Sequence, residues 1–116
     1  MRILVAEDEP LLRDMLQLDL QEQGAIVTVT HDGEEAIAAM DKEPPQLLLL
    51  DLIMPRKDGF AVLQHIRDKA YDFPVIVLSN LSDPAQERRC KELGARDFLV
   101  KSNLGTGELW EHLKKL

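Results

Sequence analysis

The sequence predicts an α/β fold, a doubly wound parallel sheet of five strands flanked by five helices. Short aliphatic segments alternate along the chain with segments whose apolar residues recur at helical spacing. Several aliphatic segments are apolar on both faces, which is typical of parallel strands covered by helices on each side. The 116 residues fit one compact domain. We therefore expect a single domain over residues 1–116, with right-handed crossovers between its strands.

The strands are predicted where aliphatic residues are densest. They are Arg2–Ala6, Ala25–Thr30, Gln46–Leu50, Val75–Leu78 and Asp97–Val100. Between the first two strands, apolar side chains recur at helical spacing and predict the first helix, at Leu12, Met15, Leu16 and Leu20. Gly24 then provides a C-terminal stop for this helix.

The next two helices each begin at an Asp-Gly pair. Asp32-Gly33 opens the second helix, which ends before Pro44-Pro45 because proline cannot continue a helix. Its apolar positions are Ala36, Ile37 and Met40. Asp58-Gly59 opens the third helix, and we expect Leu63 and Ile66 to face inward.

The last two helices follow the fourth and fifth strands. Ser82 or Asp83 can cap the fourth helix, with Pro84 in its first turn and Gly94 as its stop. The fifth helix is predicted to begin near Thr106–Glu108. Its buried stripe is expected to consist of Leu109, Leu113 and Leu116.

The charge balance excludes some classes of partner. The chain has 21 acidic and 14 basic residues and a net charge of −7, so direct nucleic-acid binding is not expected. The candidate basic cluster, Arg88, Arg89 and Lys91, is better interpreted as a solvated helix face. The apolar runs are far too short to cross a membrane, and Met1-Arg2 leads directly into the first strand. We expect a soluble, cytoplasmic protein without membrane contact.

Acidic residues follow two of the predicted strands. Glu7, Asp8 and Glu9 come directly after the first strand, and Asp51 comes after the third. Open α/β sheets bind ligands beyond the carboxyl ends of their strands, where the winding reverses. If the first and third strands are neighbours, Asp8 and Asp51 converge there, and a hard cation such as Mg²⁺ would offset their repulsion. Each acid taken alone would be an ordinary solvated loop residue.

The first of these loops argues against nucleotide or flavin binding. A protein of that kind would have a Gly-, Ser- or Thr-rich phosphate loop after its first strand. Here the loop is Glu7-Asp8-Glu9-Pro10, which repels an anion unless a metal intervenes.

Two further polar residues at strand ends complete a set suited to phosphoryl transfer. Ser79 follows the fourth strand and offers a hydroxyl, and Lys101 follows the fifth with a compact ammonium. An aspartate nucleophile, a metal, a lysine and a hydroxyl can together position and neutralise a transferring phosphoryl group. Either residue alone would be unremarkable, but their common location at one sheet edge favours the functional interpretation.

At these residues the chain resembles the receiver domains of two-component response regulators over its whole length. Four segments carry the resemblance: Ile3 to Glu9; Leu48 to Pro55 followed by Asp58-Gly59; Asp32 to Ala36; and Leu93 to Lys101. The resemblance implies a flavodoxin-like sheet with strand order 2-1-3-4-5. It also implies one receiver domain over residues 1–116 that catalyses only its own phosphorylation and dephosphorylation.

Each functional residue of the family has a counterpart here. Asp51 would be the phosphoacceptor, with Lys101 neutralising phosphate charge and Ser79 moving to hydrogen-bond the phosphate. The resemblance implies a Mg²⁺ site formed by Glu7, Asp8, Asp51 and the backbone carbonyl of Ile53. Phe98 would be the aromatic residue whose rotamer follows the switch. No other cofactor is implied.

The resemblance also implies partners. The phosphodonor would be a sensor histidine kinase or a histidine phosphotransfer protein, and the output would be a downstream protein or an effector domain. The fourth helix, fifth strand and fifth helix form the implied output face, through which a homodimer could also form. Because Ile53 and Leu81 are apolar and cannot orient a water, we expect slow hydrolysis of the acyl phosphate.

Two alternatives remain open at this stage. Asn80 and Ser102 replace the small residue and the proline that the family usually has, which permits a pseudo-receiver that binds partners independently of phosphorylation. Since a non-proline cis bond costs about 3 kcal/mol, we expect Lys101-Ser102 to be trans. A phosphatase of the haloacid-dehalogenase type would need a second Asp where Ile53 stands, so that alternative is remote.

Overall fold

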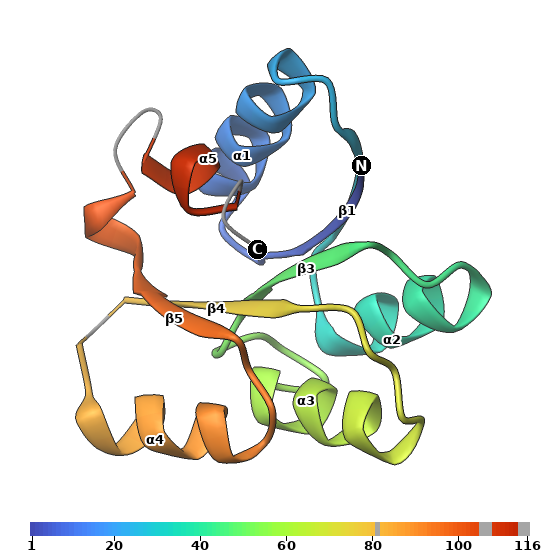
Figure 1. Cartoon of the computed structure of the whole chain (residues 1–116), viewed down its shortest axis with the longest axis vertical. Coiled ribbons are helices and arrows are strands. Elements are labelled where there is room, and N and C mark those ends of the chain that lie inside the picture. Colours follow the sequence, from blue (N-terminus) through green and yellow to red (C-terminus); the bar gives the residue numbers. More distant parts are fainter. Residues whose placement is uncertain (81, 105–107, 114–116) are drawn as a thin grey trace.

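A computed structural model arranges the chain in three layers, with a parallel sheet between two groups of helices (Figure 1). The structure describes residues 1–80, 82–104 and 108–113. The sheet has the order β2-β1-β3-β4-β5, and each adjacent pair is parallel. The predicted fold class and the strand order implied by the resemblance are both confirmed.

The elements alternate along the chain as expected. The strands are β1 (Arg2–Ala6), β2 (Ile26–Thr30), β3 (Leu47–Asp51), β4 (Val75–Ser79) and β5 (Asp97–Val100). The described residues also form the helices α1 (Pro10–Glu22), α2 (Gly33–Lys42), α3 (Gly59–Asp68), α4 (Pro84–Glu92) and α5 (Glu108–Leu113). A short 3₁₀ turn, η1 (Lys101–Asn103), follows β5 directly.

Four strand boundaries differ from the prediction. β3 and β4 each continue one residue further, because Asp51 pairs with Leu78 and Ser79 pairs with Val100 in the sheet register. A polar residue can therefore end a strand when the neighbouring strand still supplies backbone partners. β2 begins at Ile26 and not at Ala25, because the Ala25 N–H closes the end of α1 by donating to the Leu20 carbonyl. β3 likewise begins at Leu47 and not at Gln46.

The helices cover the two faces of the sheet unequally. Figure 1 shows α1 and α5 on one face and α2, α3 and α4 on the other. Leu16, Leu20, Leu109 and Leu113 are buried on the first face, and the second face buries Met40, Val62, Leu63, Ile66 and Cys90. The predicted inward positions of α3 and α5 are thus confirmed, while Leu116 lies outside the described residues.

Side-chain caps explain where three helices begin. Asp32, Asp58 and Asp83 each accept a backbone N–H from the first turn of the following helix, which satisfies donors that have no partner within the helix. Asp83, and not Ser82, is therefore the cap of α4. Gly24 and Gly94 follow α1 and α4 with φ values of 92° and 103°, as expected for glycines that end a helix.

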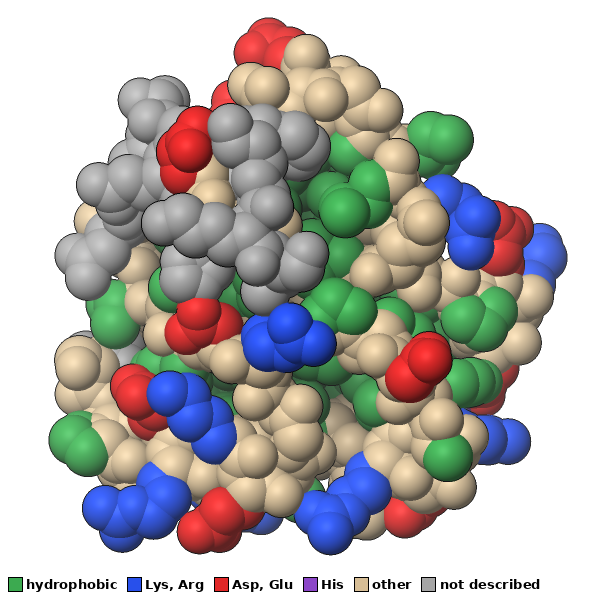
Figure 2. Space-filling view, in the orientation of Figure 1, with side chains coloured by type: hydrophobic (Ala, Val, Ile, Leu, Met, Phe, Trp, Pro, Cys, Tyr) green, Lys and Arg blue, Asp and Glu red, His purple; other side chains and the backbone are tan. Residues whose placement is uncertain are grey.

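The basic residues of α4 are exposed, and two of them have partners on neighbouring side chains. Lys91 pairs with Glu87 at 3.3 Å, and the Arg89 guanidinium lies 3.9 Å from the centroid of the Phe60 ring. Figure 2 shows basic and acidic side chains interspersed over α3 and α4 on the face in view. This supports the interpretation as a solvated helix face. Within the described ranges no helix is long and apolar enough to cross a bilayer.

Candidate functional site

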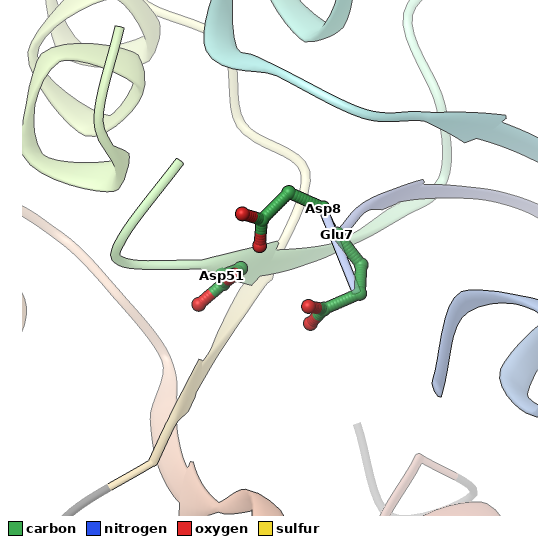
Figure 3. A group of neighbouring side chains, drawn as sticks. All are labelled: Glu7, Asp8 and Asp51. Carbon is green, nitrogen blue, oxygen red and sulfur yellow. The ribbon is translucent and has the colours of Figure 1, made fainter. Parts of the chain in front are cut away.

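Three carboxylates meet at the carboxyl ends of β1 and β3 (Figure 3). Ala6 and Leu50 are register partners, so the residues that follow them, Glu7 and Asp51, emerge side by side at this edge of the sheet. Together with Asp8, each supplies a carboxylate oxygen, and these oxygens all lie within 4.8 Å of one another. The predicted convergence of Asp8 and Asp51 is confirmed.

The cluster is largely shielded from water. Glu7 is 0% and Asp51 is 2% exposed, while Asp8 is partly accessible. Glu7 Oε1 accepts hydrogen bonds from the Glu9 N–H and from Lys101, but Glu7 Oε2 is buried without a hydrogen-bond partner among the described residues. A buried carboxylate oxygen without a partner is costly. An incoming cation or hydrogen-bond donor would remove that cost.

Lys101 brings a positive charge into the cluster. Its Nζ lies 2.9 Å from Glu7 Oε1, 3.2 Å from Asp51 Oδ2 and 3.4 Å from Glu9 Oε1. The Lys101 side chain is only 7% exposed, because it extends from the end of β5 along the edge of the sheet. One ammonium therefore faces several carboxylates, and the site keeps an excess of negative charge.

This environment shifts the pKa values of Asp51 and Lys101. Burial, a hydrogen bond with Asp8 and the charge of Glu7 raise the pKa of Asp51 to about 8, although Lys101 acts in the opposite direction. Desolvation alone would lower the pKa of Lys101, but its hydrogen bond to Glu7 and the charge of Asp51 outweigh burial and raise it. This environment therefore disfavours the charged form of Asp51 and favours the charged form of Lys101.

The other predicted site residues lie around this cluster. Ser79 is buried at the end of β4, directly after the register partner of Asp51. Ile53 is 69% exposed, and its N–H donates to Asp51 Oδ1 at 3.3 Å. The metal-binding role of the Ile53 carbonyl stays a prediction. Phe98 is buried in the core on the α4 side of the sheet.

The positions that depart from the family pattern leave the cluster intact. Asn80 is exposed, and no peptide bond within the described residues is cis, so Lys101-Ser102 is trans as expected. Lys101 reaches Asp51 although no proline follows it, with its Nζ 3.2 Å from Asp51 Oδ2. Leu81, which was expected to flank the phosphate, lies outside the described residues.

Sequence reasoning missed two contacts that shape the acidic loop. Arg13 donates from Nη1 to the backbone carbonyl of Glu7 at 3.1 Å, and Glu9 shares Lys101 with Glu7. The first contact spans six residues and ends on a backbone carbonyl, so the residue pattern held no signal for it. Both contacts place positive charge against the acidic loop.

This arrangement is suited to holding a small, hard cation. Carboxylate oxygens of Glu7, Asp8 and Asp51 lie within 4.8 Å of one another, Glu7 Oε2 has no hydrogen-bond partner among the described residues, and Asp8 keeps the cluster partly accessible. Mg²⁺ prefers such oxygen ligands and keeps waters or phosphate oxygens on its remaining positions. The chemistry of the residues present thus fits a Mg²⁺ ion.

Comparison with known proteins agrees with this geometry. The family model described as "Response regulator receiver domain" matches residues 3–114. The chain is 43% identical over 101 residues to response regulator RR06 of Streptococcus pneumoniae, an alignment covering 87% of this chain and 46% of RR06. The chain therefore spans less than half the length of that relative.

Solved structures show the same fold over nearly the whole chain. The receiver domain of the Francisella response regulator 1452 has a TM-score of 0.91 at 27% identity and covers 98% of this chain and 93% of its own. The BeF3-activated N-terminal receiver domain of Klebsiella pneumoniae RstA has a TM-score of 0.92 at 26% identity, covering 99% and 97%.

Proposed function

Since this chain belongs to the response regulator receiver domain family, we propose that it is a phosphoacceptor switch whose Asp51 takes a phosphoryl group from a phosphohistidine donor with Mg²⁺. The observation that carries the proposal is the cluster of the buried Glu7 and Asp51 with the partly accessible Asp8, and Lys101 3.2 Å from Asp51. An aspartate nucleophile beside a fixed cation and a cluster of metal-binding carboxylates matches the needs of phosphoryl transfer.

The proposed transfer makes one bond and breaks another. A carboxylate oxygen of Asp51 forms a bond to phosphorus, the N–P bond of the donor histidine breaks, and the imidazole leaves with the electron pair and takes up a proton. Lys101 neutralises the charge on the phosphoryl oxygens, and Ser79 donates its hydroxyl to one of them. The protein would catalyse only its own phosphorylation and dephosphorylation.

Glu7, Asp8, Asp51 and the Ile53 carbonyl would hold the metal. When bound, Mg²⁺ supplies positive charge that offsets the negative charge of the incoming phosphoryl group. The unpartnered Glu7 Oε2 supports this assignment, because an oxygen left without a donor is available to a cation directly or through a water. Positive charge at this point would also lower the pKa of Asp51 from about 8 and favour the nucleophilic carboxylate.

Phosphorylation would then bias a pre-existing equilibrium of the face formed by α4, β5 and α5. Phe98, buried beside α4, is the proposed packing element of that change. The upstream partner would be a sensor histidine kinase or a histidine phosphotransfer protein. The downstream partner would be a protein target, an effector domain or a second copy of the chain. Because the chain spans less than half of RR06, these partners are inferred from the family.

The exposed side chain of Ile53 supports a slow loss of the phosphoryl group. Hydrolysis of an acyl phosphate needs a positioned water, and an apolar side chain beside Asp51 cannot orient one. We expect a phosphate lifetime of many minutes, measured by mass after removal of the donor. Ile53→Asn should shorten it several-fold, and a wild-type lifetime of seconds would contradict this part of the proposal.

The direct test is intact-protein mass after incubation with acetyl phosphate and Mg²⁺. One added phosphoryl group is expected in the wild type, none without Mg²⁺, and none in Asp51→Asn. No addition, combined with undetectable Mg²⁺ binding, would favour a pseudo-receiver and direct attention to Asn80 and Ser102. The contact between Lys101 and Asp51 supports the phosphoacceptor over that alternative.

A further inference from the structure

The loop after Asp51, residues 52–58, is held in place from a neighbouring loop. Ile53, whose backbone carbonyl is a predicted ligand of Mg²⁺, lies within this loop. The backbone conformation of the loop therefore decides where that carbonyl points. The base of the loop is closed by a 2.7 Å hydrogen bond from the Gly59 N–H to the Leu52 carbonyl. The middle of the loop contacts Asp32 and Gly33, at the start of α2.

Asp32 makes two different contacts with its two carboxylate oxygens. Oδ1 accepts the Glu35 N–H at 2.8 Å and caps α2, while Oδ2 accepts Arg56 Nη1 at 3.3 Å across 24 residues of sequence. The Asp32 side chain is only 6% exposed, whereas that of Arg56 is 60% exposed. A capped and buried carboxylate cannot move freely, so it provides a fixed point for the loop.

Gly33 adds a contact through backbone alone. A Cβ built on Gly33 would collide with the carbonyl oxygen of Lys57. The loop therefore packs directly on the first residue of α2, at a distance that only glycine permits.

Arg56 has an unfavourable backbone conformation. Its φ is +63°, in the left-handed region, which costs a non-glycine residue about 1 kcal/mol. Such a conformation persists where surrounding contacts impose it. Here those contacts are the ion pair with Asp32 and the packing of the next residue, Lys57, on Gly33.

We propose that Asp32 and Arg56 are positioning residues of the proposed phosphorylation site: they fix the loop that carries the Ile53 carbonyl, which would be one of the ligands of a bound Mg²⁺. This inference rests on the proposed function, since it concerns that same site. Neither residue touches the carboxylates of Glu7, Asp8 and Asp51 in the contacts of the described residues. Both act through the backbone between Asp51 and Gly59.

The test compares Mg²⁺ affinity, by isothermal titration calorimetry, between the wild type and two single variants. Asp32→Asn keeps an N-cap side chain but loses the charge that binds Arg56. Arg56→Gln changes only an exposed side chain, so it does not threaten folding. We expect each variant to bind Mg²⁺ about tenfold more weakly, the scale typical of residues that orient metal ligands.

Arg56→Gln separates positioning from simple charge. Removing a positive charge near an acidic site should strengthen Mg²⁺ binding if only long-range electrostatics act, whereas loss of positioning weakens it. The double variant should bind Mg²⁺ no more weakly than either single variant, because each single variant already breaks the same contact between Asp32 and Arg56. Arg56→Lys should bind Mg²⁺ more tightly than Arg56→Gln. At saturating Mg²⁺ the variants should regain the wild-type rate of phosphorylation by acetyl phosphate.

A matched control is Glu87→Gln, which breaks an ion pair of the same 3.3 Å length on α4 and should leave Mg²⁺ affinity unchanged. Wild-type affinity in both test variants, with the wild type itself binding Mg²⁺ and accepting phosphate, would overturn only the positioning role. Tighter binding in Arg56→Gln would overturn it as well. A wild type that neither binds Mg²⁺ nor accepts phosphate would overturn the proposed function and this inference together.

Discussion

Two aspartates of this chain have opposite electrostatic environments. Asp41, on α2, accepts hydrogen bonds on Oδ1 from Tyr71 Oη at 2.6 Å and from His65 Nε2 at 2.9 Å. The bond from His65, followed by that from Tyr71, lowers the pKa of Asp41. Asp51 is buried, lies beside Asp8 and Glu7, and has its pKa raised to about 8.

The difference lies in what each carboxylate faces. The surface cluster of Asp41, His65 and Tyr71 supplies donors, so the charged form of Asp41 is favoured within the protein alone. The acidic edge of the sheet supplies like charges and one lysine, so the charged form of Asp51 is disfavoured until more positive charge arrives. The charged form of Asp41 thus stabilises the folded protein. The charged form of Asp51 would be stabilised only by additional positive charge, such as a bound cation.

Removing the Lys101 charge should have the largest effect on the free energy of unfolding. In Lys101→Met the buried carboxylates lose the described cation that contacts them, and breaking a buried ion pair typically costs about 3 kcal/mol. We expect that loss in urea unfolding at pH 8 with chelator present, and a smaller loss at pH 5, where Asp51 is protonated. Lys91→Met, which breaks an exposed pair, should cost less than about 0.5 kcal/mol.

Neutralising Asp51 should have the next largest effect, and it should raise the free energy of unfolding, whereas Lys101→Met lowers it. The folded-state pKa of Asp51 is about 8 against a usual 3.8, so between these pH values the folded state binds more protons than the unfolded state. The free energy of unfolding of the metal-free wild type should therefore fall as pH rises from about 4 to about 8. Asp51→Asn should remove this slope and be more stable than the metal-free wild type at pH 8. A steeper slope in the variant would contradict the assignment.

Mg²⁺ should distinguish the two regions directly. At a free concentration ten times the dissociation constant it should add about 1.4 kcal/mol to the free energy of unfolding of the wild type. Thermal unfolding with and without Mg²⁺ measures this gain, and Asp8→Asn should reduce it. Asp41→Asn should leave the gain unchanged, since Asp41 lies outside the acidic cluster.

Breaking the surface cluster should have the smallest effect. Asp41→Asn should cost less than about 1 kcal/mol at pH 7, because exposed pairs are screened by water. The folded-state pKa of Asp41 is lowered, so its contribution is present above the usual value and is lost as pH falls through the folded-state pKa. The wild type and the variant should accordingly converge in stability in acid. A gap between them that widens below pH 4 would disprove this account.

Most of the fold could be predicted from residue pattern, and the reasons are physical. The aliphatic segments, the Asp caps and the glycines after α1 and α4 mark elements locally, so their positions were correct to within a few residues. The ends of β3 and β4 could not be predicted in this way, because Asp51 and Ser79 join the sheet through partners on neighbouring strands.

The candidate site, too, could be predicted only in part from the sequence. The convergence of Glu7, Asp8, Asp51 and Lys101 follows from their place after strands whose ends share one edge of the sheet. The contact of Asp32 with Arg56 does not, because a carboxylate that caps a helix gives no sign of its second partner 24 residues away. The raised pKa of Asp51 also depends on burial that only the folded structure determines.

The place of Asp51 in the sheet has a consequence for the durability of a signal. β3 is paired on both sides, with β1 and β4, and each of its residues is buried. Amides in such a strand exchange with solvent deuterium only when the whole domain opens, whereas loops and helix ends exchange through small local fluctuations. If Asp51 is the phosphoacceptor proposed above, its phosphoryl group would be attached to a buried strand of this kind. Local fluctuations of loops and helix ends would then leave the modified strand folded.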